Sequence, residues 1–273
     1  MVRKGRFRAR KAATGTAREG AARAGLVARG VIYALVGLLA LRIAFGDSGG
    51  READRSGALE EISTKPFGAV MLWALGAGLV GMALWRLSEA LFGAAGPDGR
   101  KAKKRLMSAA RFVFYGFVAY SVLSFAAGSG GSGSSDDQSR DVTAKVLDVP
   151  AGQWIVGAAG VGLAAAGVWI AVRAVMRKYR KHLKLSEMSQ RARRAVDVAG
   201  VAGGVARGAV FAAAGVFAVR AAIDYEPDKA KGMDDTLRSF TETPMGPWLL
   251  GLVAAGLVLF GAFSWAMARW RKV

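Results

Sequence analysis

The sequence predicts an all-α, polytopic membrane protein with six transmembrane helices, arranged as three tandem two-helix repeats. Three observations support this. Hydrophobic residues make up 53% of the 273 residues and fall in long runs, basic and acidic segments alternate between these runs, and one set of spacings recurs three times. The formal net charge of +19 would indicate nucleic-acid binding in a soluble domain. In this chain the alternation of charge explains the total, so nucleic acid is not an expected partner.

Six apolar runs are long enough to cross about 30 Å of hydrocarbon as helices. They cover residues 26–45, 67–87, 108–127, 151–172, 207–223 and 247–268. The first run follows a basic start and so resembles a signal peptide. It exceeds a usual signal-peptide core, however, and the same pattern returns twice downstream, so we predict that it is retained as a span.

The segments between the runs indicate an orientation. The basic segments are 1–25, 93–107, 173–206 and 269–273, and the other three segments carry clusters of aspartate and glutamate. By the positive-inside rule the basic segments are cytoplasmic, which places both termini in the cytoplasm. The glycine- and serine-rich run 128–139 is predicted to be a flexible exterior loop.

The repeat is defined by two motifs at fixed positions. Its first helix begins with Ala-Arg, with an aromatic residue four positions later, and its second helix begins with Pro-x-Gly, with another glycine twelve positions after the proline. The Ala-Arg pairs are Ala28-Arg29, Ala110-Arg111 and Ala206-Arg207, and the later glycines are Gly78, Gly162 and Gly256. We expect these glycines to allow close helix packing, as small residues do between transmembrane helices.

Each repeat contains two spans, so all three repeats enter the membrane from the same side. They are therefore predicted to have pseudo-threefold symmetry about the membrane normal. The predicted organisation is a basic cytoplasmic tail at 1–24, repeat 1 at 25–92, a basic loop at 93–106, repeat 2 at 107–173, a basic amphipathic linker at 174–202 and repeat 3 at 203–273.

The stretches "ARGVIYALVGLLAL", "GALEEISTKPFG" and "GAGLVGMALWRLSEALFG" carry a family resemblance. Together with their two further copies, they resemble domain-of-unknown-function family 1206, bacterial membrane proteins with three copies of a two-helix transmembrane domain. The resemblance covers about residues 24 to 269 and is weakest in the second copy, where "ARFVFYGF" lacks the glycine after arginine. It implies an integral protein of the bacterial inner (plasma) membrane, and it brings no activity, cofactor or catalytic residue.

The three recurring arginines, Arg29, Arg111 and Arg207, are candidate anion or lipid-headgroup contacts. They could converge and hold a phosphate, or each could anchor its span at the cytoplasmic interface, where a long side chain reaches headgroups easily. The basic segments also predict anionic lipids at the cytoplasmic face as partners.

A second pair of arginines, Arg42 and Arg220, lies 13 residues after Arg29 and Arg207, near the outer ends of the spans. We predict that they form ion pairs, Arg42 with Glu60 or Glu61 and Arg220 with Asp224. The alternatives are contact with a substrate or ion, and extension of the side chain to the interface.

The residue types that carry most chemistry are scarce. The chain has no cysteine and one histidine, and no Asp, Glu or His lies inside the six predicted spans. No catalytic, metal or cofactor site is predicted, and the protein is not expected to be an enzyme. The expected function is a membrane component or interaction platform. The alternative is a small-solute or anion transporter or channel with a path along the pseudo-threefold axis.

Overall fold

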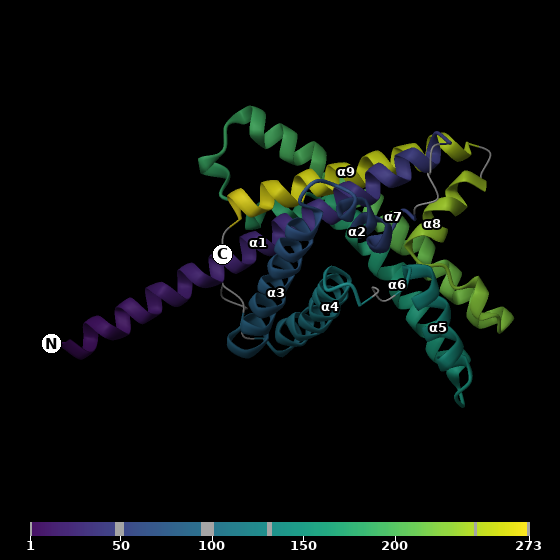
Figure 1. Cartoon of the computed structure of the whole chain (residues 1–273), viewed down its shortest axis with the longest axis horizontal. Coiled ribbons are helices and arrows are strands. Elements are labelled where there is room, and N and C mark those ends of the chain that lie inside the picture. The colour runs from purple at the N-terminus through teal and green to yellow at the C-terminus, as the bar shows by residue number, and fades with distance from the viewer. Residues whose placement is uncertain (1, 47–51, 94–100, 130–132, 243–244, 272–273) are drawn as a thin grey trace.

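A computed structural model describes residues 2–46, 52–93, 101–129, 133–242 and 245–271. Within these residues six long helices account for most of the chain (Figure 1). They are α1 (Val2–Ala44), α3 (Gly68–Phe92), α4 (Ala102–Ala126), α6 (Gly152–Val175), α7 (Gln190–Asp224) and α9 (Gly246–Trp270). Each contains a segment long and apolar enough to cross a membrane. The predicted fold class, an all-α membrane protein with six spans, is confirmed.

Two of the long helices extend well beyond the predicted spans. α1 continues through most of the predicted tail, and α7 begins at Gln190, inside the predicted linker. The start of α7 has a local cause, because the Ser189 hydroxyl accepts a hydrogen bond from the Ala192 backbone N–H. The rest of the linker forms two short 3-10 helices, η1 (Lys178–His182) and η2 (Leu185–Glu187).

One short helix lies between the two long helices of each repeat, and the apolar runs did not predict any of the three. They are α2 (Arg55–Ser63), α5 (Ser135–Leu147) and α8 (Met233–Ser239), and the 3-10 turns η3 (Pro227–Lys229) and η4 (Phe240–Glu242) flank α8. We call the end of the bundle that carries them the acidic end, and the opposite end, with η1, η2 and the end of α9, the basic end. The prediction of a loop at 128–139 is wrong for its last residues, because Ser134 caps α5 by accepting a hydrogen bond from the Asp137 N–H at 3.0 Å.

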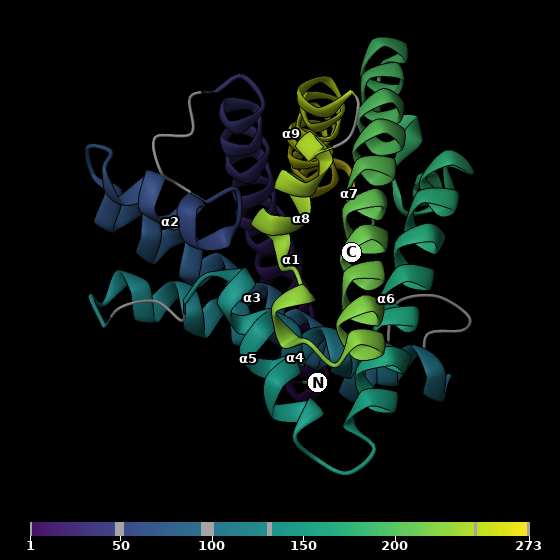
Figure 2. The ribbon, with the colours of Figure 1, turned by 90° about the vertical axis from the view of Figure 1, so that its right-hand side faces the viewer.

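The long helices pack in a cyclic order (Figure 2). The second long helix of each repeat lies along the first of the next: α3 along α4, α6 along α7, and α9 along α1. Within repeats, α1 also packs on α3 and α7 on α9, but in the described part of the chain α4 and α6 do not pack along each other. The second repeat therefore departs from the other two, and full pseudo-threefold symmetry stays a prediction.

The closest contacts between helices occur at glycines, because glycine has no Cβ atom to keep the backbones apart. A Cβ added at Gly208 of α7 would lie 2.6 Å from the Gly167 carbonyl oxygen of α6, and one at Gly30 of α1 would lie 2.9 Å from the Gly261 carbonyl oxygen of α9. Backbone therefore touches backbone at both crossings, which is how transmembrane helices gain packing energy when lipid removes the hydrophobic drive between them.

The three recurring glycines behave differently from one another. A Cβ at Gly78 would meet Ala24 and Ala28 of α1 at 3.1 to 3.2 Å, and a Cβ at Gly256 would meet Ala206 of α7 at 2.3 Å. At Gly162 a Cβ would meet nothing within 4 Å. The predicted packing role does not hold for Gly162, because α4, the helix it would contact by analogy, lies apart from α6.

Candidate functional site

The three short helices meet at their N-terminal ends, where aspartates bond the neighbouring repeat. Asp54, the N-cap residue of α2, is only 1% exposed. One of its carboxylate oxygens accepts from the Gly57 N–H at 3.0 Å, within its own helix, and the other accepts from the Ser135 N–H of repeat 2 at 2.8 Å. Asp54 thus caps α2 and ties it to α5.

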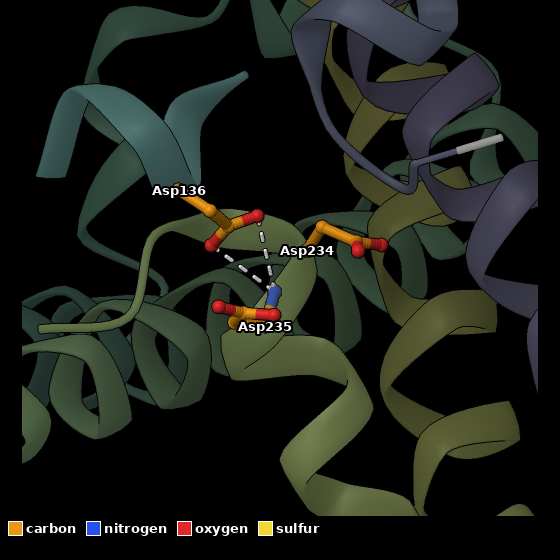
Figure 3. Close-up of side chains that lie close together, drawn as sticks. All are labelled: Asp136, Asp234 and Asp235. Atoms are coloured by element: carbon orange, nitrogen blue, oxygen red, sulfur yellow. Dashed lines mark hydrogen bonds between the residues drawn. The ribbon is translucent and has the colours of Figure 1, made fainter. Parts of the chain in front are cut away.

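Two further aspartates complete this pattern. Asp136 of repeat 2 accepts from the Asp235 N–H of repeat 3 at 3.2 and 3.3 Å, and Asp234 of repeat 3 accepts from the Ala53 N–H of repeat 1 at 2.7 Å. Figure 3 shows the first of these contacts. Repeat 1 is bonded to 2, 2 to 3 and 3 to 1. We call this set of residues the acidic ring: Asp54, Ser135, Asp136, Asp234 and Asp235.

Three members of the acidic ring are the groups that could hold a hard cation. Oxygen atoms of Asp136, Asp234 and Asp235 all lie within 4.8 Å of one another (Figure 3). Arginines of the same chain already contact two of them: Arg238 Nε lies 2.6 Å from Asp234, and Arg140 Nη2 lies 2.5 Å from Asp235. The hydrogen bonds and these ion pairs explain why the three aspartates lie close together. The cluster therefore has a structural role without a bound cation.

The buried Asp136 makes the acidic ring sensitive to pH. Loss of hydration, and then the nearby Asp235 carboxylate, raise the pKa of Asp136 from 3.8 to about 6. The folded protein therefore keeps a proton that the unfolded chain releases. This contribution to stability is fully present below pH 3.8 and is lost as the pH rises through about 6.

We therefore expect the melting temperature of the purified protein to be higher at pH 5 than at pH 7. Asp136→Asn cannot ionise and keeps one oxygen acceptor, so it should reduce this difference, as thermal unfolding at the two pH values would measure. Asp141→Asn, an exposed change on the same helix, is the matched control. The explanation fails if the Asp136 and Asp141 variants keep the same pH dependence.

At the basic end, two of the three recurring arginines point into the bundle. Arg29 of α1 and Arg207 of α7 both approach the ring of Phe260 of α9, with guanidinium carbons 5.3 and 5.1 Å from its centroid. Arg29 Nε donates to the Ser264 hydroxyl at 3.2 Å, and Arg207 Nε donates to the Tyr33 hydroxyl at 2.9 Å. These partners lie between helices, so the two side chains do not simply anchor their spans in lipid.

The third recurring arginine joins the same region from α4. Arg111 interacts electrostatically with Arg207 and with Arg86 of α3, and Tyr115, one turn further along α4, interacts with Arg29, Arg86 and Arg207. The three arginines that the repeat singles out are thus brought together around Tyr115.

Two more arginines and one acid belong to this site, and sequence reasoning missed them. Arg86 and Arg271 lie against the ring of Trp85, at 4.0 and 4.7 Å. Arg86 is 5% exposed and donates to Glu89 at 2.7 Å, one turn along α3. Arg86 and Glu89 do not recur in the repeats, whereas Arg271 has a counterpart in repeat 2, Arg177, at the same distance from the proline. The spacing of Arg86 and Glu89, three positions apart at the end of an apolar run, was the available signal.

We call Arg29, Arg86, Arg111, Arg207 and Arg271 the arginine cluster. Glu89 accepts a hydrogen bond from Arg86 and interacts electrostatically with Arg111 and Arg271, so five guanidinium groups share little negative charge in the described part of the chain. Burial, and then the positive charge of Arg86, lower the pKa of Arg271 to about 10. Within the described residues the Nε atoms of Arg86 and Arg271 are buried without a hydrogen-bond partner. Such a site favours a multivalent anion, since guanidinium groups bind phosphate and carboxylate oxygens in pairs.

At the acidic end, Arg42 Nη1 lies 3.5 Å from Glu61, which Lys65 also contacts at 2.5 Å, while Glu60 is exposed. Arg42 therefore contacts one of its two predicted partners. In the third repeat Asp224 is bound by Lys229 at 2.9 Å rather than by Arg220, which is exposed. The helix turn at Tyr225 brings Lys229 back towards Asp224, which the linear spacing did not reveal.

Comparisons with known proteins agree with the repeat. The family pattern described as Domain of Unknown Function (DUF1206) matches residues 24–93, 106–177 and 202–271. The "Uncharacterized protein YxxB" of Bacillus subtilis (strain 168) is 31% identical over 244 residues, which cover 89% of this chain and 87% of that protein. No solved structure matches the chain. The three matched segments and this relative show that the chain belongs to the DUF1206 family.

Proposed function

We propose that this protein is a non-enzymatic component of the bacterial inner membrane, with both termini in the cytoplasm, and that its arginine cluster binds a phosphate group at the cytoplasmic end. The alternation of basic and acidic segments supports the orientation, because lysine and arginine are retained on the cytoplasmic side. The scarcity of histidine and the lack of cysteine support the non-enzymatic assignment.

The excess positive charge is the observation that carries this proposal. Removal of water strengthens the repulsion between like charges and makes unpaired charges costly. A phosphate among the guanidinium groups would offset that repulsion and would offer acceptors to the buried Nε atoms of Arg86 and Arg271.

The structure supports binding better than transport through the bundle. A path through the bundle would have to open the acidic ring, where each repeat bonds the next. Two open hollows at the basic end are lined by residues such as Arg180 and Lys184, or Arg177 and Arg194, and not by the arginine cluster.

Binding can be tested with inorganic pyrophosphate and the protein purified in a neutral detergent. We expect pyrophosphate at millimolar concentration to raise the melting temperature by several degrees, because it binds the folded state selectively. The variants Arg111→Gln and Arg207→Gln should lose most of this rise. Binding would be measured directly by isothermal titration calorimetry.

The matched control is Arg220→Gln, which removes an exposed arginine at the opposite end and should leave the pyrophosphate response unchanged. If the wild-type protein does not respond, or if the Arg111 and Arg220 variants respond equally, phosphate binding at the arginine cluster is wrong.

A further inference from the structure

The second repeat lacks a helix contact that the other two form. In repeats 1 and 3 the alanine of the Ala-Arg pair is buried against the recurring glycine: Ala28, 4% exposed, meets Gly78, and Ala206, 7% exposed, meets Gly256. The equivalent residues of repeat 2, Ala110 and Gly162, are both exposed. The bundle is therefore open between α4 and α6.

The opening is next to the arginine cluster. Arg111 follows Ala110 directly and is exposed, whereas Arg29 and Arg207 are partly buried. It still interacts electrostatically with Arg86 and Arg207. Further along α4, a Cβ at Gly116 would meet nothing within 4 Å. Arg111 thus connects the interior positive charge with the surface between α4 and α6.

The chemistry of this surface matches one kind of occupant. Large apolar side chains are exposed beyond Ala110 and Gly162 along their helices, among them Phe114 and Phe117 on α4 and Trp169 on α6. Both helices are long and apolar enough to span a membrane, so this surface faces acyl chains. Apolar walls that end at a cluster of guanidinium groups are complementary to an anionic phospholipid.

We infer that an anionic phospholipid enters the bundle sideways between α4 and α6, with its phosphate on the arginine cluster and its acyl chains along the two helices. The inference rests on the proposed phosphate binding. It adds that the phosphate belongs to a lipid headgroup and that the lipid enters from the membrane between α4 and α6. A soluble phosphate would need no lateral opening.

The test is to fill the opening without touching the arginines. Gly162→Trp places a large side chain between α4 and α6, and Val161→Trp, one residue away at an exposed position, is the matched control. Each protein would be reconstituted in nanodiscs of phosphatidylglycerol and phosphatidylcholine and extracted, and its retained lipid would be measured by native mass spectrometry. We expect Gly162→Trp to retain at least fivefold less phosphatidylglycerol than wild type, and Val161→Trp to match wild type.

The response of the melting temperature to pyrophosphate distinguishes phosphate binding at the arginine cluster from lateral lipid entry. Gly162→Trp should still respond to pyrophosphate, because the change leaves all five arginines of the cluster in place. Normal retention of phosphatidylglycerol by Gly162→Trp, or equal retention of both lipids by wild type, overturns lateral lipid entry and leaves phosphate binding intact. Loss of the pyrophosphate response in wild type overturns phosphate binding itself. Ala110→Trp, at the exposed α4 position that corresponds to the buried Ala28 and Ala206, repeats the test if the first variant does not fold.

Discussion

Replacing Gly208 with valine should remove most of the folded protein. A Cβ at this position would lie 2.6 Å from the Gly167 carbonyl oxygen and 2.9 Å from the Ala171 backbone nitrogen. Overpacking against side chains costs about 1–3 kcal/mol, and here the obstacle is backbone on both sides. We expect a loss of about 3 kcal/mol or more in the free energy of unfolding. The fraction of monodisperse protein on size exclusion and its melting temperature would measure the effect.

Gly162→Val is the matched control, because it places the same side chain on another recurring small residue. No atom lies within 4 Å of the Cβ position of Gly162, so this variant should fold and melt like wild type. Equal losses from the two changes would mean that α6 and α7 do not cross at Gly167 and Gly208.

The second large effect is expected at Asp54. Asp54→Ala removes the acceptor of two backbone N–H groups, those of Gly57 and Ser135. Loss of an N-cap costs about 1 kcal/mol, and a buried N–H without a partner costs about 1–3 kcal/mol. We expect the protein to lose about 3 kcal/mol of stability. Because Asp54 joins two repeats, proteolysis of the segment between α4 and α5 should also become faster.

Asp141→Ala is the control for charge, since it removes an exposed carboxylate from the same end of the bundle. It should change the melting temperature little, as isolated surface charges contribute at most about 1 kcal/mol. A similar melting temperature for the Asp54 and Asp141 variants would contradict the role of the acidic ring.

The main architecture was predictable because the bilayer imposes it on the sequence. Apolar length marks each span, and Pro66 and Pro150 mark where second helices begin, since proline needs no hydrogen-bond partner in the first turn of a helix. The tripled spacings then group the spans in pairs. Each of these signals lies within a short stretch of sequence, so it can be recognised without knowledge of the fold.

The acidic ring was not predictable by the same means. α5 begins inside a glycine- and serine-rich run whose composition is typical of a loop, and its start depends on the cap at Ser134. The contact of Asp234 with Ala53 joins residues 181 positions apart. Such a bond follows from the tertiary arrangement, and no spacing in the sequence indicates it.

The arginine cluster was predictable in part. Arg29, Arg111 and Arg207 stand out because they recur in all three repeats, but Arg86 has no counterpart and Arg271 has one only in repeat 2, at Arg177. The opening between α4 and α6 was also predictable only in part. The sequence showed that repeat 2 departs from the others at Phe112, where repeats 1 and 3 have glycine, but it did not show which helices would separate.

The contact between α1 and α9 has a consequence for biosynthesis. Arg29 and Ser264 are 235 residues apart, so at 5–20 residues per second the ribosome completes the partner of α1 roughly ten to fifty seconds after α1 itself. During that time the glycine face of α1 that later touches Gly261 faces lipid or another protein. A chain truncated before α9 would leave this face uncovered permanently.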